Sequence, residues 1–258
     1  MAARRSNKRT RRNRGRFGFL YKLFSFLVIL VVVLGGSVIF FRVSDIAVSG
    51  ESRYTEDEIV AASGIQRGDN LFLVSRLGTA RNIRARLPYV DEVSIRRALP
   101  DEVVIEVSEC TPAAVVSGND GWWVIDGKGK ILEKMETSQR EGIATVSGIS
   151  ALLPAEGTAL AVEAEQGAKM DSLLHLLSAL VDRGMESKVS AIDVSAQSVI
   201  VLTYDGRFQV TVPMNADFAF KMRALDTLVQ EKLQPNESGS IDLTRETEVY
   251  VDTQSGEN

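Results

Sequence analysis

The sequence predicts an α+β protein with a single N-terminal transmembrane helix followed by two extracytoplasmic domains. Three observations lead to this fold class. An uncharged apolar segment about as long as a bilayer is thick follows an arginine-rich tail. The next block of the chain has the pattern β-α-α-β-β. The last block has the pattern of a mixed α/β domain with an antiparallel sheet.

Residues 23–41 are predicted to form the transmembrane helix, because this segment contains no charged residue. About 19 residues at a rise of ~1.5 Å each extend ~28 Å, close to the ~30 Å hydrocarbon core of a bilayer. A cleaved signal peptide is the alternative, because Gly35, Gly36 and Ser37 are small. The apolar region of a signal peptide is typically only ~7–15 residues long. The apolar run here continues to Phe41, which favours an anchor.

Residues 1–22 are predicted to be a basic cytoplasmic tail. They contain nine Lys and Arg residues and no acidic residue. Positive charge beside a membrane helix stays in the cytoplasm, so we expect a single-pass protein whose remaining chain lies outside the cell membrane. Nucleic-acid binding is the alternative use of such a tail, but no aromatic residue is interleaved with the arginines before Phe17.

The chain beyond this tail is acidic. Residues 23–258 hold 21 basic and 34 acidic residues, which gives a net charge of −13. This charge argues against nucleic acid or an anionic glycan as a ligand. Cys110 is the only cysteine, so no intrachain disulfide can form, and His175 is the only histidine.

Residues 43–112 form the first predicted domain. Thr55 and Glu58 have the spacing of a capping box, and Gly64 suits the end of the short helix that follows. The predicted elements are a strand at Val43–Val48, that short helix, a helix at Val74–Leu87, and strands at Val90–Ile95 and Val103–Val107. The second helix is expected to make apolar contacts through Leu77, Ile83 and Leu87.

Residues 113–252 form the second predicted domain. Asp205-Gly206 between two apolar runs is a strong signal for a hairpin turn. The predicted helices are Met170–Asp182 and Ala216–Leu233. The predicted strands are Trp122–Ile125, Lys130–Leu132, Ala144–Val146, Val189–Val194, Val199–Tyr204, Phe208–Val212, Ile241–Leu243 and Thr247–Val251. Residues 253–258 are predicted to be a polar, frayed C-terminal tail.

The sequence contains no recognisable catalytic constellation. Nothing in it brings Cys110 and His175 together as a nucleophile and a base, and zinc would require three or four such ligands. Gly127 and Gly129 are not followed by the Gly-Lys-Ser/Thr of a phosphate-binding loop. We therefore expect a protein that is not an enzyme, with no catalytic, cofactor-binding or metal-binding residues and no small-molecule substrate.

Several short patterns occur in an order that resembles the FtsQ/DivIB family of bacterial cell division proteins. In the first outer block, which resembles a POTRA domain, they are Val48-Ser-Gly50, Leu87-Pro88-Tyr-Val90, Val93-Ser-Ile-Arg96 before Leu99-Pro100, and Ile105-Glu-Val107 before Glu109-Cys-Thr-Pro112-Ala113. In the second block they are Val124-Ile-Asp126 with Gly129 and Ile131-Leu132, Ile192-Asp193, and Lys221 before Ile241-Asp-Leu243. Cys110 stands where the family usually has arginine, and Val212-Pro213 stands where it often has glycine.

The resemblance implies a non-enzymatic scaffold at the division septum. Its expected partners are FtsB/DivIC-like and FtsL-like bitopic proteins, and through them septal peptidoglycan synthases. The family also implies that a partner strand adds to the C-terminal edge of the sheet. The matching residues here are Thr247, Glu248, Val249, Tyr250 and Val251, with Tyr250 as the expected anchor.

Two alternatives remain open at this point. The strand at Thr247–Val251 can instead complete the sheet and bury Tyr250. The protein can also be a POTRA-containing component of envelope assembly or secretion.

Overall fold

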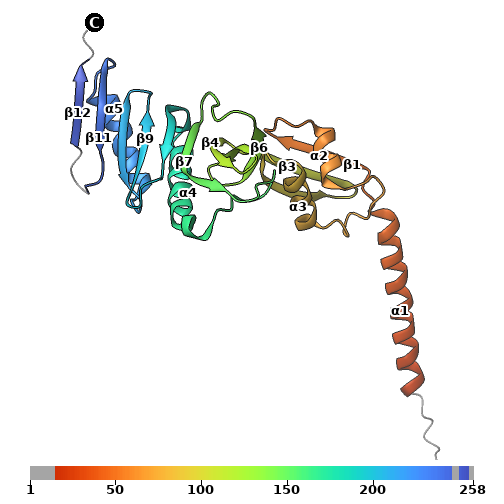
Figure 1. The fold of residues 1–258 in the computed structure, drawn as a ribbon. Coiled ribbons are helices and arrows are strands. Elements are labelled where there is room, and N and C mark those ends of the chain that lie inside the picture. Colours follow the sequence, from red (N-terminus) through yellow and green to blue (C-terminus); the bar gives the residue numbers. More distant parts are fainter. Residues whose placement is uncertain (1–14, 246–249, 256–258) are drawn as a thin grey trace, which may run out of the picture.

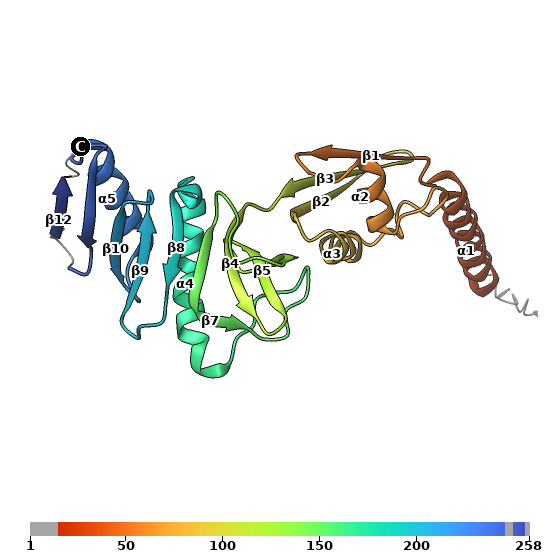
Figure 2. The ribbon, with the colours of Figure 1, turned by 45° about the horizontal axis from the view of Figure 1, so that its top comes forward.

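The computed structural model of the protein describes residues 15–245 and 250–255. The elements form an elongated row (Figures 1 and 2). Helix α1 (Gly15–Phe40) projects from one end, a small three-stranded unit follows, and a nine-stranded sheet extends to β12 (Tyr250–Ser255) at the other end. The two ends of the described chain therefore lie at opposite ends of the molecule.

Helix α1 coincides with the predicted apolar helix and extends it toward the N-terminus. Its described large side chains are solvent-exposed, because no other element packs around the helix. Among the described residues, no helix has both the length and the hydropathy of a membrane-crossing segment. The membrane span predicted from the sequence thus stays a prediction.

The three-stranded unit has the predicted β-α-α-β-β order. Its elements are β1 (Asp45–Gly50), α2 (Glu56–Ser63), α3 (Arg76–Arg86), β2 (Val90–Ala98) and β3 (Glu102–Glu109). The sheet order is β1-β3-β2, with β1 parallel and β2 antiparallel to β3. Ile59 of α2, Ile83 of α3 and Ile105 of β3 meet in its core, and all three are fully buried.

Local sequence signals explain where α2 begins and ends. The Thr55 hydroxyl accepts a hydrogen bond from the Glu58 backbone N–H at 3.3 Å, and the Glu58 carboxylate accepts one from the Thr55 N–H at 2.8 Å. This is the predicted capping box. Gly64 ends the helix at φ 74°, a left-handed conformation that costs glycine little.

The prediction that Leu77 makes apolar contacts is wrong. Ile83 and Leu87 are buried as predicted, whereas Leu77 is 80% exposed. The buried face of α3 is formed by Thr79, Ala80 and Ile83. At about 100° per residue, Leu77 lies roughly 240° from Ile83 and so faces away from the sheet.

The nine-stranded sheet has the order β12-β11-β10-β9-β8-β7-β4-β5-β6. Its strands are β4 (Pro112–Gly118), β5 (Gly121–Asp126), β6 (Ile131–Met135), β7 (Ala144–Ala151), β8 (Val189–Asp193), β9 (Val199–Tyr204), β10 (Phe208–Pro213), β11 (Glu237–Asp242) and β12. Helices α4 (Gly167–Val181) and α5 (Phe218–Glu231) pack against each other and against the sheet. Short 3₁₀ turns at Ala164–Gln166 and Glu186–Lys188 precede α4 and β8.

The expectation of an antiparallel sheet is wrong, because the sheet is mixed. Three neighbouring pairs, β4–β7, β7–β8 and β10–β11, run parallel. The connection from β7 to β8 passes through α4, and that from β10 to β11 passes through α5. Such crossovers return the chain to the same end of the sheet, which makes the joined strands parallel.

Turn and strand limits also differ in places from the prediction. Asp205 and Gly206 adopt φ 57° and 70°, which confirms the tight hairpin between β9 and β10. Strand β11 begins at Glu237, before the predicted start at Ile241, because residues 239–242 pair with β10 and residues 237–242 pair with β12. Strand β12 reaches Ser255, so the first three residues of the expected frayed tail belong to the sheet, whereas Thr247–Val249 lie outside the described residues.

Tyr89 joins the two units. Its ring is 4% exposed and packs with Val115, Val124, Leu132 and Ile143 of the large sheet. The Arg53 guanidinium lies 3.4 Å from the ring centroid, and the Tyr89 hydroxyl accepts a hydrogen bond from Arg140 Nη1 at 3.4 Å. The Cys110 N–H donates to the Tyr89 carbonyl at 2.7 Å. Both the side chain and the backbone of Tyr89 therefore bridge the boundary.

We predict that Tyr89→Ala lowers the free energy of unfolding by about 3–5 kcal/mol, because it leaves a cavity between the units. Tyr89→Phe keeps the ring and loses only the contact with Arg140, so its cost should stay near about 1 kcal/mol. Urea unfolding followed by the fluorescence of Trp122 and Trp123 measures both values. Equal losses for the two variants would contradict this account of the junction.

Candidate protein-binding edge

Strand β12 forms one edge of the nine-stranded sheet. It pairs antiparallel with β11, with Tyr250 opposite Asp242 and Val251 opposite Ile241. Within residues 15–245 and 250–255, no strand lies along its outer side. In an antiparallel pair, alternate residues direct their N–H and C=O groups toward the neighbour, and the others point away. About half of the backbone groups of β12 are therefore available to another strand.

The side chains of β12 divide between the two faces of the sheet. Val251 is half-buried and packs on the core. Tyr250 is 64% exposed, and Asp252 is also exposed. The alternative in which Tyr250 is buried is therefore wrong. The Arg245 guanidinium lies 5.1 Å from the Tyr250 ring centroid, within range of a cation–π contact.

Lys221 of α5 supports the chain just before this edge. Its side chain is 8% exposed, and its Nζ donates to the Arg245 carbonyl at 2.5 Å. Helix α5 is held in turn by Asp217, whose carboxylate caps the Phe220 N–H at 3.0 Å. The position of Lys221 thus connects α5 to the end of the sheet, in line with the family pattern found in the sequence.

A hollow of about 420 Å³ adjoins Lys221 on the surface. It is lined by Pro213, Asn215, Ala216, Asp217, Phe220, Lys221 and Thr244. Phe220 is half exposed there. The sequence patterns did not point to Phe220 or Arg245. The signal for Phe220 is an aromatic residue off the apolar stripe of α5, where a polar residue is the norm.

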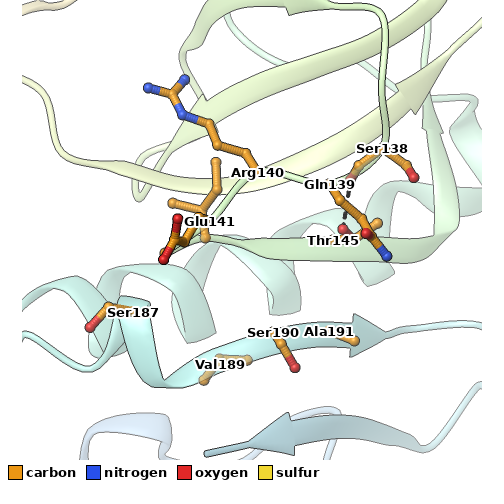
Figure 3. Close-up of a pocket in the computed structure, with 11 residues that line it drawn as sticks. Ser138, Gln139, Arg140, Glu141, Thr145, Ser187, Val189, Ser190 and Ala191 are labelled. Carbon is orange, nitrogen blue, oxygen red and sulfur yellow. Dashed lines mark hydrogen bonds between the residues drawn. The ribbon is translucent and has the colours of Figure 1, made fainter. Parts of the chain in front are cut away.

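A second cavity, of about 590 Å³, lies elsewhere, between the β6–β7 loop and the start of β8 (Figure 3). It forms where β7 and β8 separate, because these strands pair only over Thr145–Ser147 and Ala191–Asp193. Hydroxyl groups and backbone dominate its lining, and the Thr145 hydroxyl donates to the Ser138 carbonyl at 2.7 Å. Arg140 turns away toward Glu133, its ion-pair partner.

Cys110 and His175, the residues considered as nucleophile and base, lie in different surroundings. Cys110 is buried, with its Sγ 3.8 Å from the Pro88 carbonyl. His175 is exposed on α4 and lines a separate shallow hollow beside Asp217. Among the described residues, no group of three or more His, Cys, Asp or Glu side chains is arranged to hold a metal ion.

Comparison with known proteins identifies the class of the chain as a POTRA-bearing cell division protein. The family model of the FtsQ-type POTRA domain matches residues 41–109. The model of the C-terminal region of the cell division protein FtsQ/DivIB matches residues 114–244, which is half of the chain. The chain therefore belongs to the FtsQ/DivIB family of cell division proteins, as its sequence patterns predicted.

Two relatives in sequence agree with this assignment. The chain is 34% identical over 160 residues to the cell division protein FtsQ of Corynebacterium glutamicum, covering 59% of this chain and 71% of the relative. It is 24% identical over 243 residues to the cell division protein DivIB of Clostridium botulinum, covering 92% and 91%. The extracytoplasmic domain of DivIB from Geobacillus stearothermophilus matches at a TM-score of 0.32 and 13% identity, over 49% of this chain and 99% of that chain.

We predict that Cys110 is chemically inert in the folded protein. Burial raises the pKa of its thiol to about 12. At pH 8 the group is then protonated, with a thiolate fraction of about one part in ten thousand. Alkylation by iodoacetamide should be very slow in native protein and rapid in urea. Equally fast labelling in both states would show that the thiol is not enclosed.

Proposed function

We propose that the protein is a non-enzymatic, single-pass membrane scaffold of the division machinery, with residues 1–22 in the cytoplasm and the two domains outside the membrane. Strand β12 offers its open edge to a bitopic partner of the FtsB/DivIC or FtsL type. Through such partners the protein helps to localise and regulate septal peptidoglycan synthases. The single observation that carries this proposal is that β12 lies at the edge of the sheet, with no described strand along its outer side.

The anchor is supported by the surface of α1. Phe24, Phe26, Ile29 and Val32 project from different sides of the helix, and each is more than half exposed. Apolar groups on all sides of an unpacked helix are unfavourable in water and favourable in hydrocarbon. The arginine-rich residues 1–22 supply the cytoplasmic flank that sets the orientation.

The partner site is supported by the geometry of the edge. A strand added along β12 would satisfy outward-facing backbone N–H and C=O groups, for which the described part of the chain provides no partner strand. Tyr250 and Asp252 would flank it on the exposed face of the sheet. Thr247, Glu248 and Val249, which precede the described part of β12, complete the proposed contact. The family assignment favours this division role over envelope assembly or secretion.

The absence of enzymatic activity is proposed from the placement of the nucleophile and base candidates. The buried Cys110 thiol makes its hydrogen bond to a backbone carbonyl, and its high pKa keeps it from acting as a nucleophile. His175 faces solvent on α4. A protein of this kind acts through the surfaces that it presents to partners.

Replacing Tyr250 with alanine tests the partner site. An exposed aromatic residue beside an added strand is a typical anchor, and its loss commonly costs about 2 kcal/mol of binding, or roughly thirtyfold in Kd. We expect Tyr250→Ala to weaken capture of the DivIC-like partner by the detergent-solubilised full chain. Leu153→Ala, at an apolar residue that is 83% exposed in another part of the sheet domain, is the matched control. Undiminished capture by folded Tyr250→Ala would refute the site.

Two arginines in α1 test the anchor. Each Arg at the centre of a spanning helix costs about 2.5–3.5 kcal/mol on insertion scales. The double variant Ile29→Arg and Val32→Arg should therefore leave the membrane fraction or fail to be exported. The variant Ile29→Leu with Val32→Leu keeps the apolar character and should fractionate as the parent does. Retention of the arginine variant in the membrane after carbonate washing would count against a span.

A further inference from the structure

An apolar patch lies on the POTRA domain next to α1. We define it as Phe72, Leu73, Leu77 and Leu99. Outside α1, the described large apolar side chains that are well exposed are Phe72, Leu73, Leu77, Leu99, Leu152, Leu153, Phe220 and Tyr250. Four of these eight lie in the segment that leads into α3, at Phe72, Leu73 and Leu77, and in the turn after β2, at Leu99, and Arg97 of β2 is hydrogen-bonded to the carbonyls of Phe72 and Val74. Exposed apolar groups that are concentrated in this way mark an interaction surface more often than scattered ones do.

The fold holds this patch in place. The segment between α2 and α3 is hydrogen-bonded to the chain that leaves α1, with the Leu71 N–H on the Phe41 carbonyl at 2.9 Å. Arg97, near the end of β2, donates through Nη2 to the carbonyls of Phe72 at 3.2 Å and Val74 at 2.8 Å. These hydrogen bonds hold in place the turn that carries the exposed side chains of Phe72 and Leu73.

The patch is continuous with the end of α1. The Phe41 ring packs edge-to-face on Phe40, the last residue of α1, at 5.1 Å between ring centroids. The same ring packs on Phe72 of the patch at 5.0 Å. Figures 1 and 2 both show the segment between α2 and α3 beside the C-terminal end of α1. When α1 spans the bilayer, its extracytoplasmic end and the patch meet the membrane surface together.

The charges around the patch suit a lipid surface. Three arginines lie near these residues in the chain: Arg42 follows Phe41, Arg76 precedes Leu77, and Arg97 is near the end of β2. Each has a long apolar stem and a cationic head. Such side chains cover apolar surface while their charged ends reach headgroups. Acidic residues are also present at this end, at Asp45, Asp69 and Asp101, so the local charge is nearly balanced. Burial of the apolar side chains therefore supplies the attraction, with electrostatics in a minor role.

We propose that Phe72, Leu73, Leu77 and Leu99 insert into the outer surface of the phospholipid bilayer that holds α1. This inference rests on the proposed membrane span of α1. The contact gives the POTRA domain a second point of attachment, so the orientation of the rigid outer part relative to the membrane is fixed. Strand β12 is thereby held at a defined place above the membrane.

The test uses the full chain, in a Cys110→Ala background, reconstituted alone into vesicles of phosphatidylcholine and phosphatidylglycerol. Single cysteines carry the fluorophore NBD, and some of the lipid carries a doxyl quencher near the headgroup. Leu73→Cys reports on the patch, and Leu27→Cys reports on α1. Leu153→Cys is the matched control, because Leu153 and Leu73 are exposed to 83% and 80%.

The proposal predicts that the Leu73 probe emits at shorter wavelength than the Leu153 probe and is quenched severalfold more strongly by doxyl lipid. Quenching of the Leu27 probe but not of the Leu73 probe would overturn the proposed lipid contact of the patch and leave the proposed membrane span of α1 intact. If Leu27 is not quenched either, both proposals fail. A blue-shifted Leu73 probe that doxyl lipid does not quench would mean that protein, in this system a second copy of the chain, covers the patch instead of lipid.

Discussion

The contact of Tyr89 with the large sheet decides how the two domains sit relative to each other. Arg53 stacks on one face of its ring, and Val115, Val124 and Leu132 enclose it from the sheet side. The ion pair of Lys128 with Asp91, at 2.7 Å, and the bond from Lys130 Nζ to the Val90 carbonyl, at 2.8 Å, lie along the same boundary. Surface ion pairs contribute little by themselves. We therefore expect the buried aromatic ring to contribute more to the stability of the junction than the exposed ion pair does.

A fixed junction between the two domains would have a direct consequence for the proposed scaffold. The POTRA domain lies beside α1, and β12 lies at the far end of the sheet (Figure 1). With the junction fixed, the position of β12 relative to the membrane follows from how the POTRA domain is attached. The proposed lipid contact of the patch would reduce the freedom of that attachment. A partner strand that approaches β12 would then meet an edge that is already oriented, which lowers the entropic cost of binding.

Local signals in the sequence predicted local structure well. The capping box at Thr55, the helix end at Gly64 and the hairpin at Asp205-Gly206 each depend on neighbours within a few residues, and all three are confirmed. Strand β4 was missed because Ala113–Val116 are buried on both faces, so the chain shows no alternation of apolar and polar residues. The parallel pairs were missed because crossover topology decides strand direction, and no strand carries that information in its own sequence.

The candidate site could be predicted only in part. The resemblance pointed to Tyr250 and Lys221. The structure puts Tyr250 on the exposed face of an edge strand, and Lys221 donates a hydrogen bond to the Arg245 carbonyl, five residues before Tyr250. Phe220 and the exposed Leu77 were not recognised as surface residues. Leu77 was assigned to the apolar face of its helix, and Phe220, which lies off the apolar stripe of α5, was not considered. Only packing decides which side of a helix is covered. For the same reason the apolar patch was not apparent before the fold was known.

The most direct measurement of the central claim is residue-resolved hydrogen exchange of the β12 amides, with and without a DivIC-like partner. In the free protein, alternate residues from Tyr250 to Ser255 should exchange quickly, because only every second N–H bonds to β11. Binding should slow the exposed set and leave the other set unchanged. If partner binding leaves the exposed amides of β12 unprotected, strand addition at this edge is contradicted.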